Sequence, residues 1–105
     1  MKFINFVDLL KDNRKLIEFL KKEYPDIDYY DAEVYLENEI NPYAKVKIFD
    51  YNKIDGKIKM KVNNKTYINL FTLDLLVELF NDFKKMYNND NDIAKRIIEY
   101  RINDA

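Results

Sequence analysis

Two stretches of this chain alternate apolar with charged residues, and this pattern constrains the fold more strongly than any other feature. Residues 31–40 alternate acids with apolar residues, and residues 57–62 alternate lysines with apolar residues. A period of two residues indicates β-strands with one apolar and one charged face. The charges are also segregated: seven acidic and no basic residues lie between Glu23 and Glu39, but seven lysines and two aspartates lie between Lys45 and Lys65.

Helical periodicity marks both ends of the chain. Near the N-terminus the apolar residues fall on one helical stripe, which a short polar run interrupts. Either Asp12 or Asn13 can cap a new helix, so two consecutive helices are predicted, ending before Pro25. Towards the C-terminus, Thr72 is placed to cap a long amphipathic helix, and a last short helix is predicted over residues 93–102.

Four strands are predicted between these helical regions. Residues 29–37 also fit a helical stripe, but their apolar even positions favour a strand. Residues 44–48 and 57–62 alternate in the same way, and residues 66–70 make the fourth strand. The predicted fold class is therefore α+β: an N-terminal helical region, a four-stranded antiparallel β-meander and two C-terminal helices packed on one sheet face.

The turns set the expected strand register. Asp55-Gly56 predicts a two-residue hairpin that pairs Tyr51 with Met60, because both central residues of a type I′ turn need positive φ. Either a bulge near Ile48 or a longer loop is then required to keep Val46 and Ile48 on the core face. The next turn is expected to contain three residues, 63–65. One sheet face should then be buried against the helices, with contacts among Val34, Val46, Met60, Ile68, Leu20, Leu76 and Phe80.

The missing residue types limit the chemistry. The 105 residues match one domain, residues 1–105, and include no His, Cys, Ser, Trp or Gln. The chain therefore has no serine or cysteine nucleophile paired with an imidazole base, no histidine metal ligand and no disulfide framework. We expect a non-enzymatic protein with no metal site and no cofactor.

Charge and hydropathy limit the partners and the compartment. A net charge of −1 and a pI of about 5.5 provide no general attraction to nucleic acid or anionic lipid. Asn5 and Asp8 interrupt the N-terminus, unlike a signal peptide, and no apolar run approaches about 18 residues. We expect a cytoplasmic protein that does not bind membranes. The abundant Lys, Asn, Ile, Tyr and Phe have A/T-rich codons, which indicates a low-GC genome, either bacterial or viral.

One short pattern resembles the signature of restriction-type nucleases, in which Pro-Asp is followed by acid-x-Lys. Pro25-Asp26 and Asp55-Gly56-Lys57 match it here. The resemblance implies that Asp26 and Asp55 hold a magnesium ion and that Lys57 steadies the attacking water. The alternative interpretation is structural, with Asp26 as a capping residue after a helix stop and Asp55 at a hairpin tip. That family also places its acid-x-Lys on a strand, whereas Asp55-Gly56 is predicted to be a turn.

The charged strands suggest two kinds of partner. An acidic, tyrosine-bearing surface would suit another protein with a basic surface, and its residues would be Tyr29, Asp31, Glu33, Tyr35 and Glu37. The alternative is single-stranded nucleic acid on the lysine-rich sheet face, bound by Lys57, Lys59, Lys61 and Tyr67. A third interpretation needs no ligand, because Glu33 and Glu37 would simply pair with Lys45 and Lys47.

These observations predict a small protein-binding module rather than an enzyme. In size and composition the chain is similar to small phage inhibitors of bacterial defence. That similarity implies an accessory inhibitor or regulator from a phage or other mobile element, acting in the host cytoplasm if it is encoded by a virus. Its expected target is a host nucleic-acid-processing or defence protein. Single-stranded nucleic-acid binding and a magnesium-dependent nuclease are the alternative functions.

Overall fold

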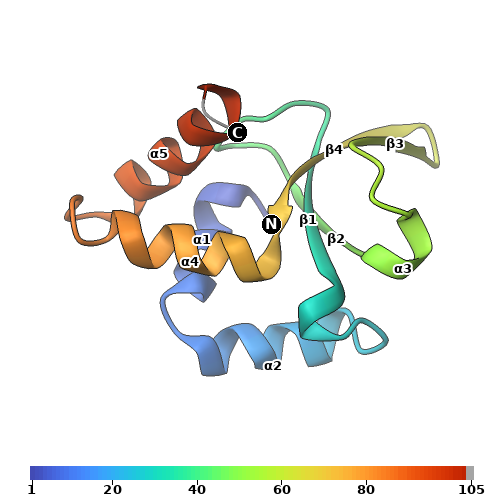
Figure 1. Ribbon diagram of the computed structural model, residues 1–105, viewed down its shortest axis with the longest axis horizontal. Helices are drawn as coiled ribbons and strands as arrows, with labels where there is room; N and C mark the ends of the chain where they lie inside the picture. The colour runs from blue at the N-terminus through green and yellow to red at the C-terminus, as the bar shows by residue number, and fades with distance from the viewer. Residues whose placement is uncertain (104–105) are drawn as a thin grey trace.

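The structure is a computed structural model, and it describes residues 1–103 (Figure 1). The last two residues of the predicted domain 1–105 lie outside this range. In chain order the described elements are α1 (Phe3–Leu10), α2 (Asn13–Glu23), the 3₁₀ turn η1 (Tyr29–Asp31), β1 (Ala32–Glu37), β2 (Val46–Asp50), α3 (Tyr51–Ile54), β3 (Lys59–Val62), β4 (Lys65–Thr72), α4 (Leu73–Phe83) and α5 (Asp90–Asn103). The α+β class and the four-stranded antiparallel sheet are confirmed.

The strand order differs from the predicted meander. The sheet order is β2-β1-β4-β3, with β4 paired antiparallel to β1 and β3 paired antiparallel to β4. In a meander each strand would pair with the next along the chain, but here β2 and β3 lie at opposite edges (Figure 1). The meander prediction is therefore wrong, because β4 pairs with the free side of β1 and so joins the β1–β2 and β3–β4 hairpins, which leaves β2 and β3 at the edges.

The helix boundaries follow from local capping. The Asp12 side chain accepts hydrogen bonds from the backbone N–H groups of Arg14 and Lys15, which fixes the predicted break between α1 and α2. At the start of α4 the Thr72 Oγ1 accepts from the Leu75 N–H at 3.1 Å, with Asp74 in the first turn. The predicted N-terminal pair of helices and the Thr72 cap are confirmed.

The main core lies between one face of the sheet and the helices. Strand side chains at Val34, Leu36 and Ile48 contribute to it, and a bulge in β4 allows both Leu70 and Phe71 to be buried. The bulge falls in the β1–β4 pair and not near Ile48, which was one of the two expected ways to reconcile the register. The helices supply the other side, with the buried residues Phe3, Phe6, Val7, Leu10, Leu16, Leu20, Leu73, Leu76, Phe80, Ile93 and Ile97.

The Asp55-Gly56 pair ends a helix instead of forming a hairpin. Asp50 caps the one-turn helix α3 by accepting from the Asn52 N–H at 2.9 Å, and Asp55 closes it at φ 54°. Gly56 continues the left-handed conformation at φ 67°. The prediction of positive φ is confirmed, but the predicted pairing of Tyr51 with Met60 is wrong because β2 and β3 are not neighbours.

The β3–β4 hairpin has a two-residue turn, so its register also differs from the expected one. Asn63 and Asn64 both adopt positive φ, and Val62 pairs with Lys65. Met60 consequently lies opposite Tyr67, on the sheet face away from the main core. The prediction that Met60 packs with Val34 against the helices is wrong, because a turn shorter by one residue moves every β3 side chain to the other face.

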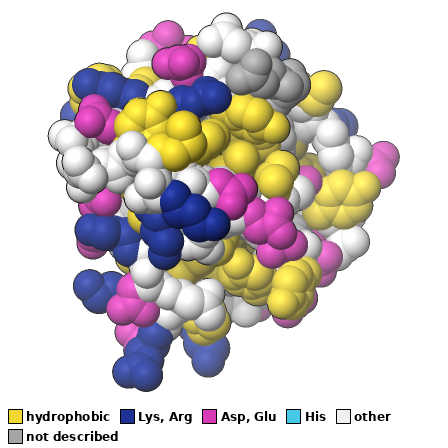
Figure 2. Space-filling model, turned by 60° about the vertical axis from the view of Figure 1, so that its left-hand side comes forward, with side chains coloured by type: hydrophobic (Ala, Val, Ile, Leu, Met, Phe, Trp, Pro, Cys, Tyr) yellow, Lys and Arg dark blue, Asp and Glu magenta, His cyan; other side chains and the backbone are white. Residues whose placement is uncertain are grey.

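The charge pattern varies over the surface. Figure 2 shows the side where α4 and α5 lie, and there hydrophobic patches are interrupted by charged side chains of both signs.

Within residues 1–103, every helix is too short or too polar to cross a membrane.

Phe80 provides a test of how α4 packs. Its side chain is 2% exposed in the main core, so we expect Phe80→Ala to lower the free energy of unfolding by ~3–5 kcal/mol. Chemical denaturation measures the change. Leu75→Ala is the matched control, because Leu75 lies on the same helix but is 39% exposed, and it should cost clearly less. Equal effects of both substitutions would contradict the described helix orientation.

Candidate functional site

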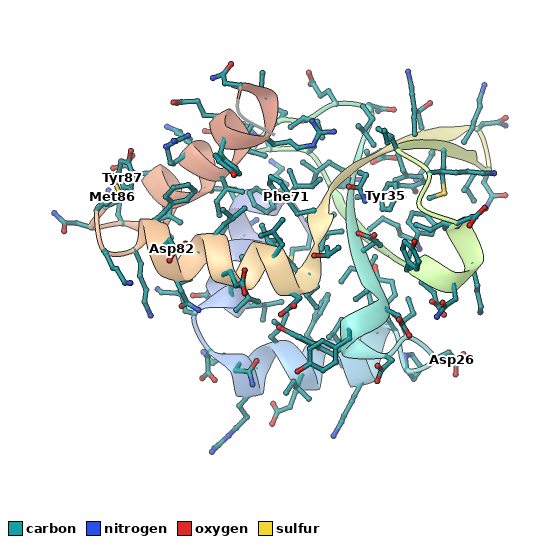
Figure 3. All side chains as sticks on the ribbon, in the orientation of Figure 1. Asp26, Tyr35, Phe71, Asp82, Met86 and Tyr87 are labelled. Carbon is teal, nitrogen blue, oxygen red and sulfur yellow. The ribbon has the colours of Figure 1, made fainter. Side chains whose placement is uncertain are left out.

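The candidate residues Glu33, Tyr35 and Glu37 share one sheet face, which points away from the main core. The β1–β4 register places Tyr35 opposite Asn69 and Glu37 opposite Tyr67 on this face. In Figure 3 Phe71 lies on the side of the helices and Tyr35 on the side of α3. The alternation that the sequence predicted for β1 is thus confirmed, but the second face is not an open charged surface.

Tyr35 is completely buried on this second face. Its ring packs edge-to-face against Phe49 at 5.1 Å between centroids, and Phe49 packs in the same way against Tyr67 at 5.4 Å. The Tyr35 hydroxyl donates a hydrogen bond to the Lys57 carbonyl oxygen, and burial raises its pKa. The expectation that Tyr35 is exposed for a partner is wrong, because α3 and the following connection cover it.

Glu33 is the one buried charged residue in the part of the chain that the structure describes, at 7% exposure. Its carboxylate accepts a hydrogen bond from the Asn69 Nδ2 at 3.3 Å, and no cation within residues 1–103 pairs with it. Burial raises the pKa of the Glu33 carboxyl, and the Asn69 hydrogen bond opposes that rise only in part. Glu33 therefore belongs to a buried polar network, not to an accessible acidic surface.

The cross-strand ion pairing differs from the expected one. Glu37 pairs with Lys65 of β4, with 3.6 Å between the carboxylate oxygen and Nζ, instead of with Lys45 or Lys47. Lys47 lies over the Tyr24 ring, 5.8 Å from its centroid. This arrangement follows from the strand order, because β4 supplies the second neighbour of β1.

Tyr29 and Asp31 lie apart from the other three residues, in the turn η1 before β1. Tyr30, between them, is 77% exposed and contacts the Tyr29 ring edge-to-face at 5.0 Å. The sequence pattern assigned Tyr30 to the core side of a strand, which is wrong because β1 begins only at Ala32. Burial raises the pKa of Tyr29, with a further contribution from Asp74.

A pocket of about 480 Å³ opens beside η1, between α2 and the loop that follows it. We call it the acidic pocket, and it is lined by Ile17, Leu20, Lys21, Tyr24, Pro25, Asp26, Ile27, Asp28 and Tyr29. Its walls are mostly apolar and its rim carries two exposed aspartates against one lysine. Within residues 1–103 neither aspartate forms an ion pair, so the rim keeps its negative charge.

The lysines of the nucleic-acid alternative line a second pocket, of about 380 Å³. We call it the lysine pocket, and its lining residues are Phe49, Lys53, Ile54, Lys57, Lys59, Met60, Lys61 and Val62. Tyr67 does not line it, but its ring packs against Phe49. The prediction that Tyr67 shares one sheet face with Lys59 and Lys61 is wrong, because the β3–β4 register pairs Tyr67 with Met60. Sequence reasoning missed Lys53 and Phe49, since their contribution depends on how α3 folds back over the sheet.

The nuclease-like residues do not have the secondary structure that the resemblance requires. Asp55 ends α3 in the left-handed conformation and Lys57 precedes β3, so the acid-x-Lys does not lie on a strand. Asp26 lies in the loop after α2, on the rim of the acidic pocket. Residues 1–103 contain no group of three or more Asp or Glu side chains that could hold a metal ion.

Comparisons with known proteins do not assign this chain to a family. No family model matches this chain, and searches of curated proteins and of solved structures find no match either.

The burial of Glu33 predicts that the stability of the fold depends on pH. Since burial raises its pKa in the folded state, the fold is favoured where Glu33 is protonated, and this advantage is lost as the pH rises through the titration of the carboxyl. Glu33→Gln keeps an acceptor for Asn69 without a charge, so we expect a higher melting temperature at pH 7. The gain should vanish near pH 3, below the ordinary glutamate pKa of about 4.3.

Glu39→Gln is the matched control, because Glu39 is exposed. Melting curves of both variants and of the unsubstituted protein at the two pH values provide the measurement. A Glu33→Gln variant that is less stable at pH 7, or equally stabilised at both pH values, would contradict the assigned role of burial.

Proposed function

We propose that this protein is a protein-binding module that uses its acidic pocket to bind a basic segment of another protein. The observation that carries the proposal is the combination of apolar walls with an unpaired acidic rim. Lysine and arginine side chains combine an aliphatic stem with a positive head, so they match a site of this composition. The function proposed from the sequence is kept, but its site moves from the face of β1 to the turn before it.

The exposed aromatic beside the pocket supports a protein partner. Tyr30 is a large side chain held against Tyr29 at a defined angle, and such tyrosines provide contact area at low cost in conformational entropy. Asp31 and Asp74 extend the negative charge beyond the pocket towards the start of α4. Aromatic anchors surrounded by charged residues are typical of protein interfaces.

The charge of the site indicates the class of partner. Proteins that handle nucleic acid carry lysine- and arginine-rich surfaces for phosphate, and an acidic module complements such a surface. An inhibitor or regulator that occupies the basic surface of a nucleic-acid-processing protein is the form of this function that we propose. The small size and the A/T-rich coding composition support a phage or mobile-element origin.

A short peptide of alternating lysine and leucine tests the site directly, with a glutamate–leucine peptide as its control. We expect the basic peptide alone to bind, and Asp28→Lys to weaken it mainly through a slower association rate. Tyr30→Ala should weaken binding by ~2 kcal/mol if Tyr30 is the aromatic anchor. Isothermal titration and stopped-flow fluorescence measure these changes.

The control variant is Asp82→Lys, which makes the same charge change at an exposed position of α4. Figure 3 shows Asp82 and Asp26 at opposite ends of the molecule. Asp82→Lys should leave peptide binding within about twofold of the unsubstituted protein, since only a screened long-range charge changes. Equal weakening by Asp28→Lys and Asp82→Lys, or no binding at low salt, would contradict the acidic pocket as the binding site.

A further inference from the structure

The lysine pocket lies on the opposite sheet face from the main core, between α3 and β3. It is a different surface from the acidic pocket and shares no residue with it. Four of its eight lining residues are lysines, and the other four, Phe49, Ile54, Met60 and Val62, are apolar. No acidic residue lines it. Lys53 and Lys57 lie beside this apolar floor, whereas strand alternation places the Lys59 and Lys61 side chains on the other face of β3 from Met60 and Val62.

The positive charge of this pocket is not neutralised by neighbouring acids. Within residues 1–103, none of its four lysines forms an ion pair. Of the acids near the pocket along the chain or sheet, Asp50 caps α3, Glu37 pairs with Lys65 and Glu33 is buried against Asn69. Asp55, between Lys53 and Lys57 in the sequence, is exposed and is the one neighbouring acid in residues 50–62 that is not engaged in this way. With four lysines against Asp55, the pocket and its surroundings keep a net positive charge.

Protection of the sheet edge from pairing with other chains explains only some of the lysines of the lysine pocket. β3 is an edge strand, and lysines on edge strands prevent pairing with other chains. That role fits Lys59 and Lys61, which lie on β3 itself. It does not explain Lys53 on α3 or Lys57 in the connection, which line the same pocket.

The wall of the pocket is held in place by two long-range hydrogen bonds. The Asn69 N–H donates to the Ile58 carbonyl at 2.7 Å, and the Tyr35 hydroxyl donates to the Lys57 carbonyl. Ile54, the last residue of α3, is only 7% exposed. The α3–β3 connection is therefore attached to the sheet, and the pocket exists before any ligand arrives, which lowers the entropy cost of binding.

We infer that the lysine pocket binds single-stranded nucleic acid. Lys53 and Lys57 flank the apolar floor, and Lys59 and Lys61, ~7 Å apart on the other face of the edge strand β3, can contact successive phosphates of a chain that runs along this edge. An unpaired base can rest on the apolar floor, where Phe49 is only partly buried and packs against Tyr67. A duplex presents phosphates but no free base, so the apolar floor favours a single strand.

Fluorescence anisotropy with labelled 12-nucleotide DNA and RNA single strands tests this inference. We expect binding at low salt that weakens steeply as salt rises, through release of counterions. Lys57→Glu and Lys59→Glu should each reduce the affinity at least tenfold and lower the salt dependence. The Lys57 substitution leaves its backbone carbonyl, the acceptor for Tyr35, in place. Unchanged melting temperatures would show that both variants still fold.

Lys95→Glu is the matched control, because Lys95 is an exposed lysine of α5 outside the pocket, and it should change the affinity less than threefold. Inorganic polyphosphate carries phosphate charge but no bases, so competition with it distinguishes binding through base contacts from binding through charge alone. Poor displacement by polyphosphate of matched charge would support a base on the apolar floor. No binding, equal weakening by Lys95→Glu, or full displacement by polyphosphate would overturn the inference. Asp28→Lys should not abolish this binding, so failure of either proposed site is distinguishable from failure of the other.

Discussion

The pairing of β4 with β1 is the constraint on which the rest of the structure depends. It joins segments far apart in the sequence, and closing such a long loop costs conformational entropy. The cost is offset by burial, because this pair brings Val34 and Leu36 together with Leu70 and Phe71 in the main core. Once β4 lies beside β1, β3 can be added only at the outer side of β4, and the chain from β2 must cross to the other edge.

The segment that makes this crossing covers the second face of the sheet. The connection carries α3 over Tyr35 and Phe49, and it turns an alternating, partly charged strand face into a small buried cluster. Glu33 is enclosed there with a single hydrogen-bond partner, which is an unfavourable environment for a carboxylate. The same crossing places lysines from α3, the connection and β3 around one pocket. The route of the chain from β2 to β3 thus decides both which acids are buried and which lysines lie close together.

The charge segregation of the sequence survives folding as two separate surfaces. Most of the acids that remain accessible lie before β1, around η1, with Glu39 exposed after β1, and the lysines lie around β3. Only the Glu37–Lys65 pair joins the two charged segments within residues 1–103. The proposed binding of a basic protein segment at one surface and of single-stranded nucleic acid at the other both follow from this incomplete neutralisation.

The sequence by itself determined what depends on near neighbours along the chain. The helix break at Asp12, the Thr72 cap, the strand character of β1 and the positive φ of Asp55 and Gly56 all arise from interactions spanning a few residues. Sequence alternation also separated the two faces of β1 correctly. It could not tell which face would stay in contact with water, because an apolar–polar alternation does not reveal a covering segment from elsewhere in the chain.

Only the tertiary structure decided the strand order, the β3 register and the exposure of the tyrosines. Tyr35 was expected at the surface and Tyr30 in the core, and the structure reverses both. The physical reason is that burial depends on which distant segment packs on a side chain, and a one-residue difference in the β3–β4 turn moves a whole strand to the other face. Strand pairing between distant segments is set by the total apolar surface buried, which local sequence patterns do not encode.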